Sequence, residues 1–127
     1  MVKISYEVPG FARSYEAAGS LVTSQFKFVK MSGANVTAVS AATDKAVGVL
    51  QNKPDAAGKA ATVMIDGVSR VRAAGAIAAG VPVYMSADGS ATATQAASAL
   101  CVGVSENSVV GAGELVSVLI KPLGAVV

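Results

Sequence analysis

Side chains that could carry out acid–base, metal or nucleophilic chemistry are sparse in this sequence. It has no histidine, the commonest general base and a frequent metal ligand. Its eight Asp and Glu residues never cluster as the several carboxylates of a hard-metal site would require. Gly111-Ala112-Gly113 lacks the rest of a phosphate-binding motif. We therefore expect no enzyme, no cofactor and no metal site, and a Ser–Lys pair is the one nucleophilic arrangement that the sequence leaves open.

The single cysteine, Cys101, excludes an internal disulfide framework. It lies in a valine-rich run, which favours a buried, inert thiol over a reactive one.

The composition indicates one small domain with a thin core. The chain has 127 residues, of which 53% are apolar but only 5% aromatic, and it has no Trp. Because most of the apolar residues are Ala and Val, each residue buries little apolar area, and association between copies is one remedy. We therefore expect a homo-oligomer.

The charge pattern argues against two classes of partner. The formal net charge is +2, and the basic residues are scattered rather than arranged in a stripe with stacking aromatics, so we expect no nucleic-acid binding. No apolar run has the length of a membrane span, and the N-terminus lacks the apolar segment of a signal peptide. We expect no membrane partner and no export through a cleaved signal.

An internal repeat organises the chain. Residues 46–65 align without a gap on residues 101–120, at a spacing of 55 positions. The identical pairs are Val47/Val102, Gly48/Gly103, Val49/Val104, Asn52/Asn107, Gly58/Gly113, Val63/Val118 and Ile65/Ile120. With a one-residue gap the match extends upstream, where residues 17–21 align with 73–77 and Gly33 with Gly89. We therefore predict two copies of one unit, at about residues 17–65 and 73–120.

Short strands separated by turns are expected throughout both copies. Phe26–Met31 alternates in the manner of a half-buried strand, and Val81–Met85 is a further strand with Pro82 near its start. Asp66-Gly67 and Asp88-Gly89 predict hairpin turns. The alanine-rich stretch 73–80 contains two glycines, which favours a turn over a helix. The predicted fold class is all-β, a small β-barrel or sandwich built from a duplicated strand–turn unit, with residues 19–127 as a single β domain.

The N-terminal segment 1–18 differs from the repeat. It holds three of the six aromatic residues, together with charges of alternating sign and a Pro9-Gly10 breaker. Two interpretations stay open: an edge strand packed across the domain, or an extended arm that orders on a partner through aromatic anchors and charged flanks. The candidate contact residues of such an arm are Lys3, Tyr6, Phe11, Arg13 and Tyr15.

Residues 17–120 taken together resemble the phage head decoration, or capsid cement, proteins. The resemblance is carried by an ordered series of Val-Gly-Val strands and glycine turns followed by apolar residues: Ala17-Ala18-Gly19, Val47-Gly48-Val49, Gly58, Val63, Asp66-Gly67, Gly75-Ala76-Ile77, Gly80-Val81-Pro82-Val83-Tyr84, Gly89, Val102-Gly103-Val104, Gly113 and Val116–Ile120.

The resemblance implies a non-catalytic structural protein of the virion. Its partner would be the major capsid protein, which it would bind on the outside of an expanded icosahedral shell, commonly as a homotrimer. It would be made in the host cytoplasm, and the arm would be one of its capsid-binding elements, with its aromatic and basic residues as the contacts.

Two other functions stay open. Val29-Lys30-Met31 faintly resembles the Met-Lys-Met hairpin of biotinyl and lipoyl carrier domains, although it lacks the first methionine and the acidic flanks. A β-sandwich that binds a glycan or a protein surface is the other alternative, and the few aromatic residues argue against a sugar-stacking platform.

Overall fold

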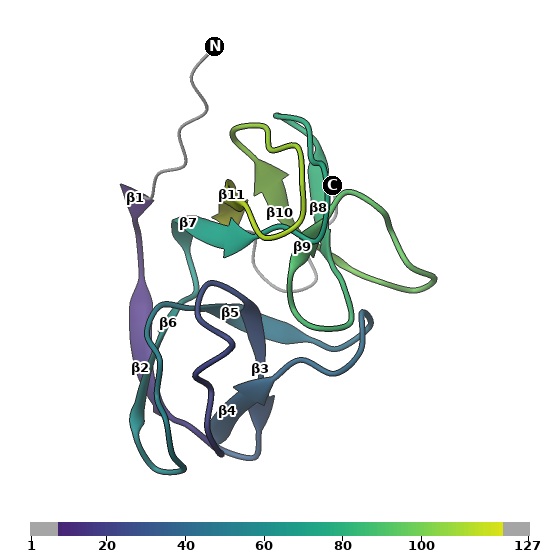
Figure 1. Ribbon diagram of the computed structural model, residues 1–127. Coiled ribbons are helices and arrows are strands. Elements are labelled where there is room, and N and C mark those ends of the chain that lie inside the picture. Colours follow the sequence, from purple (N-terminus) through teal and green to yellow (C-terminus); the bar gives the residue numbers. More distant parts are fainter. Residues whose placement is uncertain (1–7, 121–127) are drawn as a thin grey trace.

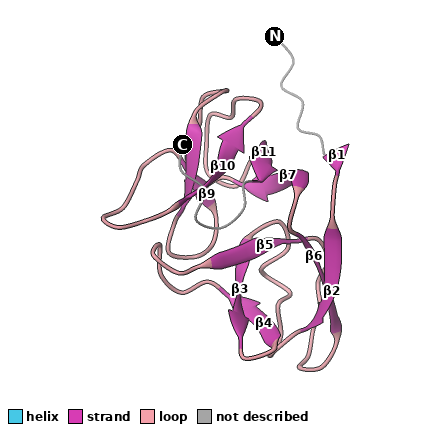
Figure 2. Ribbon diagram, turned by 180° about the vertical axis from the view of Figure 1, so that it is seen from behind, coloured by secondary structure: helices cyan, strands magenta, loops and turns pink. Residues whose placement is uncertain are grey.

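The computed structural model describes residues 8–120, and within this range every regular element is a strand and none is a helix (Figure 2). The strands are β1 (Val8–Pro9), β2 (Ala12–Glu16), β3 (Phe28–Ser32), β4 (Asn35–Ala38), β5 (Ala46–Leu50), β6 (Ala60–Met64), β7 (Gly67–Arg72), β8 (Pro82–Met85), β9 (Ala91–Thr92), β10 (Cys101–Ser105) and β11 (Leu115–Ile120).

The strands form two antiparallel sheets. Sheet A has six strands in the order β1-β7-β11-β10-β8-β9, and sheet B has five in the order β2-β6-β5-β3-β4. Sheet A occupies the upper half of Figure 1 and sheet B the lower half, and the chain passes from one half to the other between β1 and β2 and between β6 and β7. The all-β prediction is confirmed, and the arrangement is a sandwich of two open sheets rather than a closed barrel.

The two sheets are copies of one unit, down to the register of the pairs. Val29 pairs with Gly48 in β3–β5, and Val83 pairs with Gly103 in β8–β10, with the same register shift beside each glycine. The order β2-β6-β5-β3-β4 thus corresponds to β7-β11-β10-β8-β9, and β1 is an addition to sheet A. Residue numbers at equivalent positions differ by 54 between β3 and β8 and by 56 between β2 and β7. They differ by 55 between β4 and β9, between β5 and β10, and between β6 and β11.

Each unit curls until its first strand, β2 or β7, ends beside its last, β4 or β9. In sheet B the meeting point is a parallel bridge between Ala17 and Val36, and in sheet A it is the equivalent bridge between Ala73 and Ala91. The side chains inside the curl of sheet B form a small core that includes Val29, which is buried. We call this side of each sheet its inner face and the opposite side its outer face.

The main core lies where the outer face of sheet B packs on the inner side of sheet A. Successive strand residues point to opposite faces, so Phe28 points away from the small core that holds Val29. Phe28 belongs instead to a second cluster, together with the inner-face residues Val83 and Val118 of sheet A. Both faces of sheet B are therefore buried, which explains how a chain poor in large side chains still encloses a core.

The chain departs from two local expectations. Asp66-Gly67 does not close a hairpin, because β6 belongs to sheet B and β7 to sheet A, and the turn carries the chain between the sheets. Phe26 lies before β3 in a left-handed turn, with φ at 62°, rather than in the strand. The predicted hairpin at Asp88-Gly89 is confirmed, since β8 and β9 pair on either side of it.

The N-terminal segment 1–18 runs along the edges of both sheets as far as it is described. Residues 1–7 lie outside the described residues. β1 pairs with β7, and β2 pairs with β6 over all five of its residues, from Ala12 to Glu16. Residues 12–16 are thus an edge strand of sheet B, and the first unit starts before Ala17, where the sequence alignment placed its beginning.

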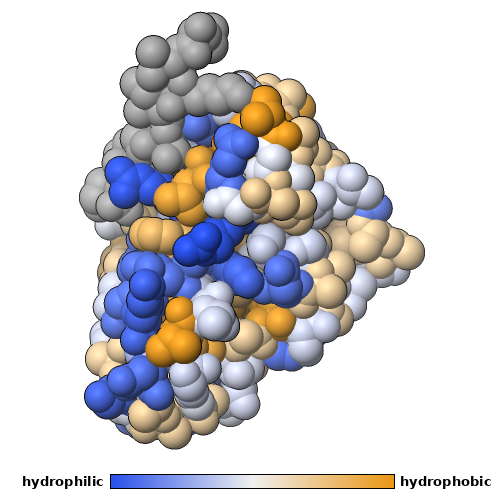
Figure 3. Space-filling view, viewed as in Figure 1, coloured by the Kyte–Doolittle hydropathy of each residue, from blue (hydrophilic) through white to orange (hydrophobic). Residues whose placement is uncertain are grey.

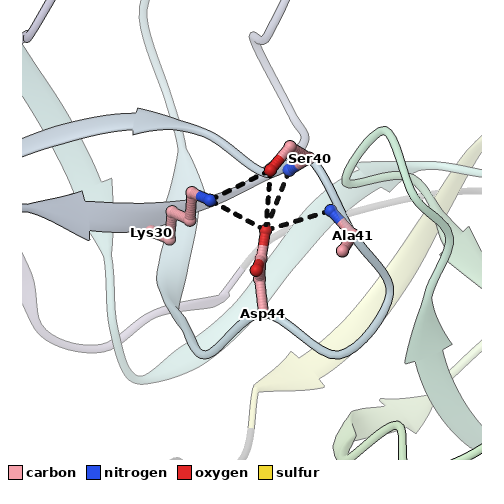
Figure 4. A network of polar contacts seen from close by, with 4 residues as sticks. All are labelled: Lys30, Ser40, Ala41 and Asp44. Atoms are coloured by element: carbon pink, nitrogen blue, oxygen red, sulfur yellow. Dashed lines mark hydrogen bonds and ion pairs between the residues drawn. The ribbon is translucent and has the colours of Figure 1, made fainter.

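A polar network holds the connection between β4 and β5 against β3. The Oδ2 atom of Asp44 accepts hydrogen bonds from the backbone N–H groups of Ser40 (2.9 Å) and Ala41 (3.0 Å), and from Lys30 Nζ (3.0 Å), as Figure 4 shows. These contacts favour the carboxylate form, and the Ser40 N–H followed by the Lys30 ammonium lowers the pKa of Asp44 from 3.8 to about 2.

The first prediction concerns the two strand glycines. A Cβ atom on Gly48 would collide with the carbonyl oxygen of Met64, and one on Gly103 would collide with that of Leu119. Because these obstacles are backbone atoms, Gly48→Ala and Gly103→Ala should each lower the free energy of unfolding by about 3 kcal/mol. Denaturant unfolding measures this. The control is Gly75→Ala, where a Cβ meets nothing within 4 Å, and an equal loss in the control would contradict the explanation.

The second prediction concerns acid stability. A carboxyl group whose pKa is lowered by folding stabilises the fold fully above its unfolded pKa, and this contribution disappears as the pH falls through the folded pKa. We expect Asp44→Asn to lower the Tm at pH 7 and to flatten its fall between about pH 4 and pH 2. Asp66→Asn is the charge-matched control, because among the described residues that carboxylate accepts only the adjacent Gly67 N–H. An unchanged pH profile in Asp44→Asn would refute the prediction.

Candidate interaction surfaces

Phe11 is presented to solvent on a fixed backbone. Its N–H donates to the carbonyl of Asp66 (3.2 Å), and its own carbonyl accepts from the N–H groups of Ile65 (2.8 Å) and Asp66 (3.3 Å). These bonds hold the turn between β1 and β2 against the crossing from β6 to β7, while the ring itself is 56% exposed. Because the backbone is already fixed, binding of this side chain in a partner's pocket adds no cost for ordering the backbone.

Arg13 and Tyr15 form a separate group on the same strand. Both lie on β2, two residues apart and therefore on one face, and the Arg13 guanidinium carbon is 5.0 Å from the centre of the Tyr15 ring. They line a hollow of about 730 Å³ that also includes Met31 and Asn35 from the β3–β4 hairpin. Phe11 is not part of this hollow. Of the five predicted contact residues, Lys3 and Tyr6 lie outside the described residues.

Met31 is a candidate interaction residue that the sequence analysis missed. It is 40% exposed in the hollow, whereas Met85, at the equivalent position of sheet A, is 2% exposed. The other large exposed apolar residues are Phe11, Val22, Leu100 and Val110, and on the face of the molecule in Figure 3 apolar residues form small separate patches among hydrophilic ones. The signal that identifies Met31 is the difference between two equivalent positions, not its own residue type.

The residues considered for covalent chemistry are placed differently. Lys30 lies in the middle of β3, where its ammonium pairs with Asp44 at 3.0 Å and its side chain is 28% exposed, so it is not displayed at a hairpin tip as a carrier lysine would be. Cys101 is half-buried, and its thiol lies 3.2 Å from the carbonyl of Gly103. Phe28, one of the few aromatics available for sugar stacking, is buried in the main core.

Within residues 8–120, His, Cys, Asp and Glu side chains nowhere gather in a group of three that could hold a metal ion. The same range also contains no helix with the length and apolar character needed to cross a membrane.

Comparison with known proteins identifies the family. A search among curated proteins found no match. Among solved structures, the N-terminal base of the head fibre protein gp8.5 of bacteriophage phi29 superposes with a TM-score of 0.66. The superposition covers 87% of this chain and 93% of that chain at 16% sequence identity, which establishes a shared fold.

A family model of the phage cement proteins matches residues 17–121, which span both copies of the repeated unit. This range begins at the first bridge residue, Ala17, and ends next to β11. Since the match takes in β3 to β11, nine of the eleven strands, the chain belongs to the phage cement protein family.

Proposed function

We propose that this protein binds the outer surface of an expanded phage capsid and stabilises it. The observation that carries the proposal is the match to the phage cement proteins over residues 17–121. A structural role at the capsid agrees with the family, and the exterior of an expanded shell is the more specific part of the proposal.

The physical mechanism is the bridging of neighbouring shell subunits. Pressure from the packaged genome acts to separate subunits, and a protein that contacts two of them adds an interface that must break at the same time. Individual interfaces of this kind can be modest, because many copies act together on one shell. Rigid β units with few ionisable groups suit this covering role.

The N-terminal residues are the proposed capsid-binding element. Lys3, Tyr6 and Phe11 supply basic and aromatic groups in a segment of eleven residues before β2. Phe11 is the described member of this group, and its hydrogen-bonded backbone and exposed ring support its role as an anchor. Lys3 and Tyr6 are proposed as further contacts, and addition of a strand to a capsid sheet edge is one mode of binding that this segment could use.

The third prediction tests this proposal by co-sedimentation of the purified protein with expanded, empty capsids, with unexpanded shells for comparison. We expect saturable binding to the expanded form only. Removal of residues 1–7 keeps β1 and β2, and should abolish capsid binding while the far-UV circular dichroism spectrum is retained. Binding of the wild-type protein to neither form would refute the function, and retained binding after the deletion would refute the role of the arm.

The fourth prediction isolates Phe11. Phe11→Ser should weaken capsid binding about 30-fold, the loss expected for an aromatic hot spot worth about 2 kcal/mol. Its stability should stay close to wild type because the ring is 56% exposed. Val110→Ser is the matched control, since Val110 is 67% exposed in the connection between β10 and β11. Equal affinity of the Phe11→Ser and Val110→Ser variants would exclude Phe11 as an anchor.

A further inference from the structure

The contact between the two units of the chain is one-sided. The carbonyl of Phe26, in the first unit, accepts a hydrogen bond from the N–H of Arg72, in the second unit (2.8 Å). A true twofold relation would add the reciprocal bond between the equivalent groups, from the Glu16 N–H to the Gly80 carbonyl, and no such bond is present among the described residues. In this contact the first unit, which is sheet B, contributes its outer face, and the second unit, strands β7 to β11 of sheet A, contributes its inner side.

A one-sided contact leaves an unused copy of each contacting surface in the same chain. The second unit has an outer face equivalent to the one that the first unit buries. The first unit has an inner rim equivalent to the one that the second unit covers. Surfaces that are related in this way share the backbone arrangement of a pair that already packs inside the chain, although their side chains differ.

The unused outer face is apolar and accessible. Phe28, Val49 and Met64, which the first unit buries against sheet A, are replaced in the second unit by other apolar side chains. Of these replacements, one is exposed and two are half-buried. We call these three replacements the outer patch: Pro82, Val104 and Leu119.

The unused inner rim is also apolar. Val71, Met85, Val102 and Ile120 are at most 7% exposed in sheet A, where the first unit covers them. The equivalent residues of the first unit are half-buried or, for Met31, 40% exposed. We call these residues the open rim: Tyr15, Met31, Val47 and Ile65.

The hollows at the two rims show the same difference. At the open rim the hollow has a volume of about 730 Å³ and is lined by Glu16, Asn35 and Gly58 among others. The equivalent hollow of sheet A, lined by the corresponding residues Arg72, Ser90 and Gly113, has a volume of about 520 Å³. Lys27 from the first unit lines it as well, so a neighbouring unit already occupies part of this hollow.

The polar groups around the two unused surfaces are complementary. The amide of Gln51 donates to Ser69 Oγ (2.9 Å) inside the chain, and the equivalent positions are Glu106 beside the outer patch and Arg13 beside the open rim. The contact inside the chain has two neutral polar groups at this position. The contact between copies would have the opposite charges of Glu106 and Arg13 there. Complementary charges of this kind fix the register of an interface.

We infer that copies of this chain associate head to tail, with the outer patch of one copy packed into the open rim of the next. The occupant of the open rim is therefore a second copy of this chain. Such a heterologous contact closes into a ring when the rotation between copies closes, and otherwise continues as a filament. Arg13 and Tyr15 then contact a neighbouring copy rather than the shell. The inference does not depend on capsid binding.

The test uses the full-length protein without capsids. Sedimentation velocity over a range of concentrations should show a concentration-dependent oligomer for the wild type. Met31→Lys places a charge in the open rim, and Pro82→Asp places one in the outer patch, both at accessible positions. Each variant should associate roughly 30-fold or more weakly with itself. Val110→Asp is the control and should assemble as the wild type does.

Mixing the two variants distinguishes a head-to-tail contact from a symmetric one. The Met31→Lys variant keeps its outer patch and the Pro82→Asp variant keeps its open rim, so an equimolar mixture should form a 1:1 dimer and nothing larger. If Met31→Lys changes the circular dichroism spectrum, Arg13→Glu replaces it, because Arg13 is exposed. A wild type that is monomeric at all concentrations, variants that assemble as the wild type does, or a mixture that forms no dimer would each overturn the inference.

Discussion

The packing of the outer face of sheet B on the inner side of sheet A is the contact on which the rest of the structure depends. A five-stranded unit whose apolar residues are mainly Ala and Val buries little apolar area by itself. The small core inside sheet B is an example, since it holds few side chains larger than valine. Placing one unit against the other adds Phe28 and Met64 to the second core, where the larger apolar side chains are concentrated. The duplication therefore stabilises the fold, because the two copies of the unit bury apolar side chains against each other.

The parts of the fold that sequence reasoning predicted are those where backbone geometry restricts the residue type. Gly48 and Gly103 are alike because a carbonyl group lies where a Cβ would be, and Val63 and Val118 are alike because both fill the inside of a curl. The strands β2 and β7 are equivalent in pairing but have no side chain in common, since one is exposed at an edge and the other is covered. An alignment of side chains therefore placed the start of the first unit too late.

The candidate surfaces were predictable only in part, for a related reason. The aromatic and charged residues of the terminal segment predicted Phe11, Arg13 and Tyr15 as candidates, but they did not reveal that Phe11 lies apart from the hollow that the other two line. Met31 is an ordinary strand residue in the sequence, and its importance emerges only when its exposure is compared with that of Met85. The passage of the chain from sheet B to sheet A at Asp66-Gly67 could not be predicted either, because a turn motif does not specify which sheet the next strand joins.

The direction in which β2 joins its sheet has a mechanical consequence. If residues before β1 are attached to a shell, a pull on them reaches first β1, which pairs with β7 at Val8 and Pro9, and then β2, which pairs with β6 over five successive residues. A force along a strand loads all of its inter-strand hydrogen bonds at once, whereas a force across the strand would open them one after another. Forced unfolding is governed by the rate of barrier crossing rather than by equilibrium stability. A pull directed along β2 would therefore have to break its five pairs with β6 together, whereas a pull across the strand would break them in turn.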